Sequence, residues 1–140
     1  MMRVLDTRNI TVREELTVRG EAPRRWIYRG EVCICNEEDD YSRAIPFLLA
    51  AGSLRQKRVA WIGGGFCIGP RAFAVANCDQ TVFEQEPALE EFCPDGVRFV
   101  PGPWRDTIQG LFDVIIYDVG GEIPRDELDK YLKPEGAVLA

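Results

Sequence analysis

The sequence predicts an α/β protein in which a doubly wound, mostly parallel sheet follows an N-terminal β-hairpin region. From Lys57 onward, short apolar runs alternate with helical patterns, which is typical of parallel strands joined by crossover helices. Before that point, period-two alternation and a glycine turn indicate antiparallel strands. We therefore expect an N-terminal strand and hairpin arm over residues 1–36 and an α/β core over residues 37–140.

The arm is expected to form strands between residues 3 and 35. Apolar residues at even-numbered positions predict a strand with one buried face: Ile10, Val12, Leu16 and Val18. Apolar runs on both sides of Arg29-Gly30 predict a hairpin with those two residues as its turn.

A helix should follow the arm. The acidic run at 37–40 suits the positive end of a helix dipole, and Gly52 is a natural stop. Pro46 fits such a helix if it begins near Tyr41 or later, because proline is tolerated only in the first turn.

The core is predicted to alternate strands and helices to its end. We expect strands over 59–62, 81–83, 97–100, 112–117 and 137–139. We expect helices over 70–76, 87–92, 105–109 and 124–132, and a turn over 133–136.

Composition excludes several classes of function. The formal net charge of −6 argues against nucleic-acid binding, and an acidic body attracts cationic substrates such as amines. Histidine is absent, which excludes catalytic triads and zinc sites that need imidazole. The five cysteines contain no C-x-x-C pair, so we expect reduced thiols and no metal. Nothing reads as a signal peptide or a membrane span, so we expect a cytoplasmic protein with no membrane partner.

A glycine turn after the first core strand is the sharpest motif. Gly63, Gly64 and Gly65 let the backbone turn tightly and approach a ligand, and a helix begins just beyond them. Glu84 ends the second core strand, where a carboxylate can accept both ribose hydroxyls of a nucleoside; Glu86 is the alternative. The plainer interpretations are a turn that binds nothing and a solvated acid at a strand end.

Asp118 closes the most apolar strand. Ligands of open α/β sheets bind beyond the carboxyl ends of the strands, so Asp118 is well placed for proton abstraction or for holding a cation. Asp113 is expected at the opposite end of that strand.

Four motifs together resemble a known family. They are VAWIGGG at 59–65, VFEQEP at 82–87, FDVIIYD at 112–118 and YLKPEG at 131–136. From about Trp26 to Ala140 the chain resembles the spermidine synthase (polyamine aminopropyltransferase) branch of the class I S-adenosylmethionine-dependent methyltransferases. The resemblance implies a Rossmann-like fold of the class I methyltransferase type.

The resemblance also implies a ligand and a reaction. The three glycines would line a small-molecule nucleoside, S-adenosylmethionine or its decarboxylated form, and Glu84 would hold its ribose. Asp118 would receive the proton of an attacking amine. Tyr41, in the family's acidic helix entrance, and Glu122, an approximate match to a second acid of the family, would contact the substrate.

The chain departs from the family pattern at several points. Phe66 and Cys67 follow the glycines where the family has an acid and more glycine. Pro103 stands where the family has an acid that contacts adenine, and Ser42 replaces a histidine beside Tyr41. The sequence ends at Ala140, after the fifth core strand, so we expect the C-terminal strand pair of the fold to be missing and the bare edge or the arm to pair in a homo-oligomer.

Three functions remain open from the sequence. The first is an S-adenosyl-type nucleoside binder that acts as an aminopropyl- or methyltransferase. The second is a catalytically inactive relative that serves as a binding or assembly module. The third is an NAD-binding Rossmann protein, whose glycine spacing would differ from the one seen here.

Overall fold

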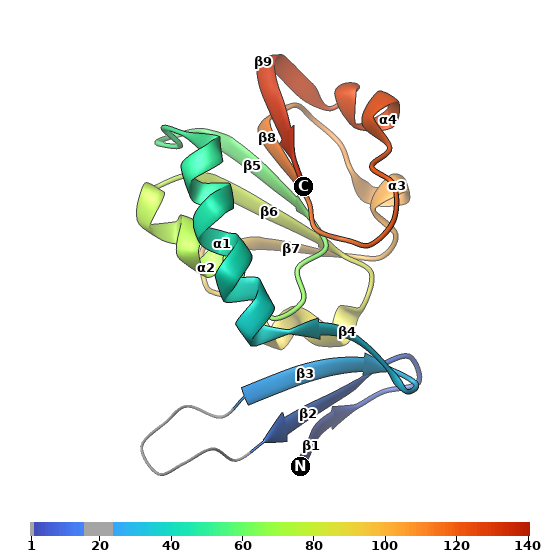
Figure 1. Ribbon diagram of the computed structural model, residues 1–140. Helices are drawn as coiled ribbons and strands as arrows, with labels where there is room; N and C mark the ends of the chain where they lie inside the picture. Colours follow the sequence, from blue (N-terminus) through green and yellow to red (C-terminus); the bar gives the residue numbers. More distant parts are fainter. Residues whose placement is uncertain (1, 16–23) are drawn as a thin grey trace.

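Two sheets make up the protein. The computed structural model describes residues 2–15 and 24–140, and Figure 1 shows a four-stranded antiparallel sheet below a five-stranded parallel one. The parallel sheet has the order β7-β6-β5-β8-β9, which is a doubly wound topology. The predicted fold class is therefore confirmed.

The N-terminal sheet follows chain order. Its strands are β1 (Met2–Asp6), β2 (Thr11–Glu15), β3 (Arg24–Arg29) and β4 (Val32–Asn36). The predicted hairpin between β3 and β4 is present, but its turn lies one residue later than predicted, at Gly30-Glu31, because Arg29 pairs with Val32. Gly30 takes a positive φ of 62°, which the first position of a type II′ turn requires. The expected strand positions Leu16 and Val18 lie outside the described residues.

Helix α1 (Glu37–Ala51) begins earlier than a first-turn position for Pro46 would allow. The Asn36 side chain accepts the backbone N–H of Asp39 at 2.8 Å, and four acids fill the first turn. These features fix the start at Glu37, in the acidic run that the sequence suited to a helix start, so Pro46 lies inside the helix and the condition of a start near Tyr41 or later is not met. Burial of Ala44 and Phe47 on either side of Pro46 offsets the lost backbone hydrogen bond. Gly52 ends the helix as predicted, with a φ of 69°.

The core elements follow the predicted order. The strands are β5 (Arg58–Ile62), β6 (Asp79–Glu84), β7 (Arg98–Pro101), β8 (Phe112–Tyr117) and β9 (Leu132–Leu139). The helical segments are α2 (Ile68–Phe73), η1 (Ala74–Ala76), η2 (Pro87–Phe92), α3 (Trp104–Thr107) and α4 (Arg125–Asp129). The turn predicted over 133–136 is instead a bulge within β9: β8 pairing steps from Leu132 to Ala137, and Glu135 takes a φ of 65°.

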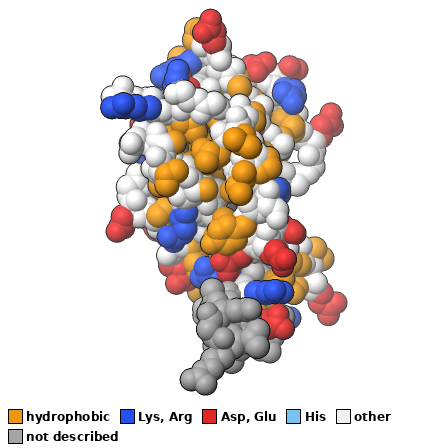
Figure 2. Space-filling model, turned by 60° about the vertical axis from the view of Figure 1, so that its left-hand side comes forward, with side chains coloured by type: hydrophobic (Ala, Val, Ile, Leu, Met, Phe, Trp, Pro, Cys, Tyr) orange, Lys and Arg blue, Asp and Glu red, His pale blue; other side chains and the backbone are white. Residues whose placement is uncertain are grey.

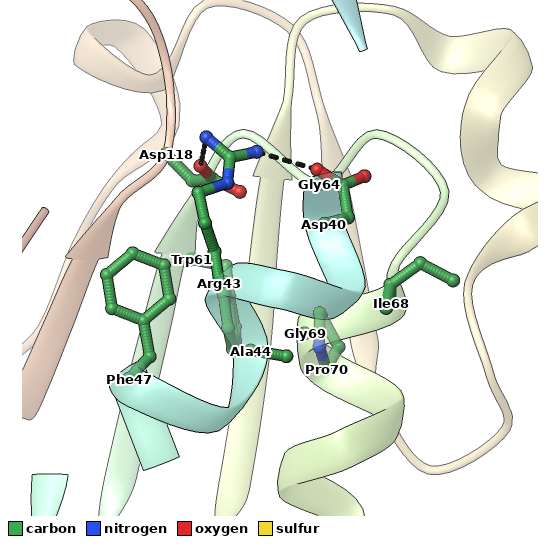
Figure 3. Close-up of a pocket in the computed structure, with 10 residues that line it drawn as sticks. All are labelled: Asp40, Arg43, Ala44, Phe47, Trp61, Gly64, Ile68, Gly69, Pro70 and Asp118. Atoms are coloured by element: carbon green, nitrogen blue, oxygen red, sulfur yellow. Dashed lines mark hydrogen bonds and ion pairs between the residues drawn. The ribbon is translucent and has the colours of Figure 1, made fainter. Parts of the chain in front are cut away.

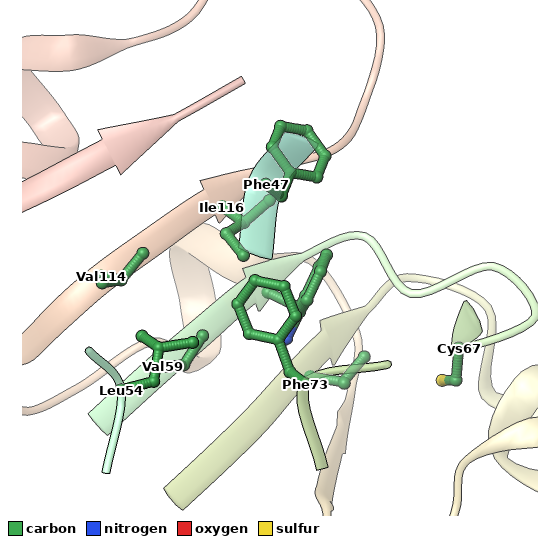
Figure 4. Packing of buried hydrophobic residues seen from close by; sticks show 9 residues of the cluster. Phe47, Leu54, Val59, Cys67, Phe73, Val114 and Ile116 are labelled. Carbon is green, nitrogen blue, oxygen red and sulfur yellow. The ribbon is translucent and has the colours of Figure 1, made fainter. Parts of the chain in front are cut away.

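The two faces of the parallel sheet bury different side chains. On one face, Trp61 packs edge-on against Phe47 of α1 and Phe73 of α2. Figure 4 shows Phe47 and Phe73 within this buried cluster. The indole N–H donates to Gln80, which satisfies a buried polar group. The other face lies under α3 and α4, where Ile115 and Leu128 are buried. This packing fixes the strand ends that form the candidate site.

A third cluster joins the N-terminal sheet to the core. Ile27 of β3 and Phe66 of the glycine loop are buried together with Phe92 of η2. Arg25 lies over the rings of Phe66 and Phe92 and forms an ion pair with Glu37 at 2.6 Å. The N-terminal sheet is therefore held against the glycine loop.

The outer surface of α1 is apolar. Tyr41, Ile45 and Leu49 of α1 recur at four-residue spacing, and each has most of its surface exposed. Figure 2 shows apolar side chains gathered on one face of the molecule. Within residues 2–15 and 24–140, no helix is long and apolar enough to cross a membrane. The homo-oligomer stays a prediction.

Asp113 lies at the amino end of β8, away from the candidate site, as expected. Its carboxylate accepts the backbone N–H of Arg58 at 2.8 Å and the ammonium of Lys133 at 3.2 Å. Burial alone raises the pKa of Asp113, but these two donors outweigh it and hold the pKa below its usual range. A lowered pKa in the folded state stabilises the fold above the ordinary value near 3.8, and this stabilisation is lost as pH falls through the folded pKa.

Asp113→Asn should therefore lower the free energy of unfolding by about 1–2 kcal/mol at neutral pH. The difference from the parent protein should shrink as pH falls below 3.8, because the parent carboxylate then takes up a proton. Urea denaturation across that range measures it, with the exposed Asp129→Asn as control. A difference that does not change with pH would contradict the ionic origin of the effect.

Candidate functional site

The carboxyl ends of β5, β6 and β8 meet at a cavity of about 560 Å³. This is the edge of a doubly wound sheet at which ligands bind, and the volume is in the range of small-molecule sites. Five residues predicted from the sequence line it together: Gly63, Gly64, Gly65, Glu84 and Asp118. Tyr41 and Glu122 are not among the described lining residues.

The three glycines are required by neighbouring parts of the chain. A Cβ on Gly63 would lie 2.7 Å from Cγ1 of Val119 and 2.8 Å from the backbone oxygen of Asp118. A Cβ on Gly64 would lie 2.6 Å from Cγ1 of Val82, and one on Gly65 would lie 2.9 Å from the sulfur of Cys35. The loop therefore lies close against β6, β4 and the segment that follows β8.

Glu84 holds this loop in place. One carboxylate oxygen, Oε1, accepts the N–H groups of Gly64 and Gly65, each at 3.1 Å, and Oε2 accepts the N–H of Glu86 at 2.8 Å. Only 8% of the Glu84 surface is exposed. The residue predicted to meet a ribose thus has a structural role in which three backbone donors converge on one carboxylate.

Glu86 makes a different contact. It is also buried, and its Oε1 accepts a hydrogen bond from Arg29 of β3 at 3.2 Å. Both residues line the cavity, so its wall holds an ion pair in which the N-terminal sheet supplies the guanidinium and the segment after β6 supplies the carboxylate.

Asp118 lies beside the guanidinium of Arg43, which no sequence pattern had singled out. Figure 3 shows Arg43 of α1 between two carboxylates: Nη1 lies 3.1 Å from Asp118 and Nη2 lies 2.6 Å from Asp40. Burial raises the pKa of Asp118; Arg43 opposes this shift and Asp40 adds to it. The net result is a carboxylate with a raised pKa, which binds a proton more readily than an exposed aspartate does.

Cys35 completes this corner of the site. Its thiol donates to Asp40 at 3.0 Å, and burial together with the Asp40 charge raises the thiol pKa. The group is therefore a protonated hydrogen-bond donor at neutral pH and is not activated as a nucleophile.

Phe66 does not fill the cavity. Its ring lies 5.0 Å from that of Phe92 inside the cluster beneath the N-terminal sheet. Two other aromatic residues, Phe83 of β6 and Trp104 of α3, do line the cavity. Trp104 is half-buried and packs edge-on against Tyr117.

The remaining predicted substrate contacts lie elsewhere. Tyr41 is 61% exposed on the outer face of α1. Glu122 is exposed and borders a separate hollow beside α4. In the part of the chain that the structure describes, no group of three or more acidic or cysteine side chains is arranged to hold a metal ion.

The sequence could not have selected Asp40, Arg43 or Arg29. Asp40 is one of four consecutive acids, and only the helix start at Glu37 decides which of them turns inward. Arg29 reaches the cavity through contacts between the two sheets, which leave no local pattern.

Comparisons with known proteins identify the fold. No family model matches the chain, and no curated protein matches it. Solved structures do. A protein-L-isoaspartate O-methyltransferase is 19% identical, with a TM-score of 0.61, over 91% of this chain and 40% of its own. A SAM-dependent methyltransferase from Thiobacillus denitrificans, in complex with S-adenosyl-L-homocysteine, is 18% identical, with a TM-score of 0.56, over 69% of this chain and 46% of its own.

A mutant of MtNAS in complex with S-adenosylmethionine is also similar, at 22% identity and a TM-score of 0.54, over 71% of this chain and 44% of its own. The chain thus spans less than half the length of these three structures. At these identities the likeness is one of fold. The protein has the Rossmann-like fold of class I S-adenosylmethionine-dependent methyltransferases.

Proposed function

We propose that the cavity binds an S-adenosyl-type nucleoside and that the protein transfers a group from its sulfonium to an amine. The observation that carries the proposal is the convergence of the glycine loop, Glu84 and Asp118 on one cavity. Four carboxylates and two guanidinium groups line it, which gives a formal charge of −2. A negative cavity favours a sulfonium cation over a neutral or anionic ligand.

Glu84 would accept hydrogen bonds from the ribose. A carboxylate has about four acceptor positions, and the backbone donors of Gly64, Gly65 and Glu86 occupy three of them. A ribose hydroxyl can use the remaining position or share one. Phe83, Leu89 and Trp104 line the same cavity and would provide apolar area for a purine.

Asp118 would act as the base. An ammonium is not a nucleophile, so an acceptor amine must lose a proton before it attacks the carbon next to sulfur. The new N–C bond forms as the C–S bond breaks, sulfur becomes a neutral thioether, and the amine proton passes to the Asp118 carboxylate. The raised pKa of Asp118 suits it to this step.

A second candidate function is nucleoside binding without turnover. One observation favours it: the Arg43 guanidinium already lies 3.1 Å from Asp118, at the position that an acceptor amine would need. Such a protein would bind the ligand tightly and release no product.

A thermal-shift panel separates these functions. We expect S-adenosylmethionine, S-adenosylhomocysteine and methylthioadenosine to raise the melting temperature, and NAD to leave it unchanged. A ligand at a hundredfold excess over its Kd stabilises by about 2.7 kcal/mol. A response to NAD alone, or to none of the four, would contradict the proposal.

Turnover is tested with the amine acceptors putrescine and spermidine. Asp118→Asn should keep the thermal shift and remove product formation. Binding by the parent protein with no product from either amine favours the second candidate.

A further inference from the structure

Helix α1 presents an apolar row that the candidate site does not use. Tyr41, Ile45 and Leu49 are 61%, 65% and 78% exposed, and their four-residue spacing places them along one side of the helix. Pro46 and Ala50 are exposed beside them. Isolated exposed apolar side chains are ordinary, but a contiguous group of them marks an interaction surface.

The apolar surface is wider than one side of the helix. Pro46 borders a hollow of about 380 Å³ whose opposite wall includes Val119 and Ile123, after β8. Val119 is itself 44% exposed. Apart from the pair of Arg43 and Asp118, the side chains that line this hollow are uncharged. The surface therefore extends from α1 to the segment that follows β8.

The two ends of this surface carry opposite charge. The first turn of α1 is acidic, and the exposed Glu38 lies seven residues before Ile45, which is about two turns and therefore the same side of the helix. Arg55 follows the end of the helix and is exposed. A two-fold axis through the middle of the row would bring each acidic end beside a basic end and would oppose the two helix dipoles favourably. The surface is thus complementary to itself.

We propose that a second copy of this chain packs on α1, with the two helices antiparallel about a two-fold axis near Ile45. Tyr41 of each copy then lies beside Leu49 of the other, and Glu38 of each copy lies near Arg55 of the other. Such a contact uses the same patch on both copies, so it closes as a dimer and leaves no free patch to extend.

The edge of the parallel sheet is less suited to self-association. Strand β9 is at that edge, but its pairing with β8 steps from Leu132 to Ala137 through a bulge. Pro134 lies within the bulge and has no N–H to donate. Bulges and prolines are features that keep an exposed edge from pairing with another chain, which favours α1 as the contact surface.

Sedimentation velocity of the full chain over about 1 to 100 μM tests the inference. We expect a dimer of twice the 15.8 kDa chain mass. Ile45→Arg places two like charges against each other at the axis and should raise the dissociation constant at least about 100-fold. Leu49→Arg should act in the same direction. Val32→Arg is the matched control, because Val32 is as exposed as Ile45, at 65%, but lies on β4.

Charge exchange tests the antiparallel arrangement. Glu38→Arg and Arg55→Glu should each raise the dissociation constant roughly 3- to 10-fold, because each places like charges at both ends of the contact. A chain with both changes should return to within about twofold of the parent, since the pair is only reversed across the axis. Weaker association of the double variant than of either single variant would contradict the antiparallel order.

Two other results would overturn the inference. The first is a parent protein that stays monomeric over the whole concentration range. The second is a dimer that survives both Ile45→Arg and Leu49→Arg; its loss in Val32→Arg would place the interface on the edge strand β4. Circular dichroism of each variant shows whether its fold is retained, as we expect for arginine at exposed helix positions. None of these results bears on the nucleoside site, which the thermal-shift panel tests separately.

Discussion

Replacing Glu84 by alanine should lower the free energy of unfolding by about 2–4 kcal/mol and weaken nucleoside binding at least tenfold. The variant leaves the N–H groups of Gly64, Gly65 and Glu86 without the carboxylate on which they converge. A buried donor without an acceptor costs roughly 1–3 kcal/mol, and water from the cavity would recover part of that loss. The freed loop would also no longer present a fixed surface to a ligand.

Chemical denaturation measures the first effect and calorimetry with methylthioadenosine the second. Glu91→Ala is the matched control, because Glu91 is an exposed acid a few residues further along the chain. A Glu84→Ala protein as stable as the control would show that water replaces the carboxylate fully. Unchanged nucleoside affinity would remove the ribose assignment.

Gly63→Ala should be as damaging, for a steric reason. Gly63 has a φ of 88°, which a residue with a Cβ adopts only under strain. The added methyl group would also meet the backbone oxygen of Asp118 at 2.8 Å, and backbone cannot move aside as a side chain can. Strain and overpacking together should cost about 2–5 kcal/mol.

Gly120→Ala provides the comparison within the same cavity wall. A Cβ on Gly120 would meet nothing within 4 Å, so this variant should unfold within about 0.5 kcal/mol of the parent protein. Melting curves of both variants measure this difference in stability. Equal stability of Gly63→Ala and Gly120→Ala would mean that the loop lies differently from the arrangement described.

Much of the fold could be predicted because its signals are local. The apolar run at β8 predicted a buried strand at its observed bounds, and the glycines after β5 predicted the turn. The start of helix α1 was ambiguous, because the acidic run at 37–40 and Pro46 pointed to different positions. Proline chemistry favoured a late start, and the Asn36 cap with the acidic first turn outweighed it.

Site residues could be predicted from the sequence only where the order of the strands determines where a residue lies. Glu84 and Asp118 stand at strand ends, and parallel topology brings such ends together. The orientation of the Glu84 carboxylate toward its own glycine loop, and the reach of Arg43 to Asp118, depend on packing between elements distant in sequence. Tyr41 is the opposite case. Its place in the helix-entrance motif predicted a substrate contact, but nothing in the sequence indicated that its side chain faces outward.

A crystal structure with methylthioadenosine tests the proposed nucleoside site most directly. We expect the ribose within hydrogen-bonding distance of the Glu84 carboxylate, the thioether sulfur beside the loop at Gly63 to Gly65, and the Glu84 contacts with that loop retained. A nucleoside bound elsewhere, or bound here with its ribose turned away from Glu84, would contradict it.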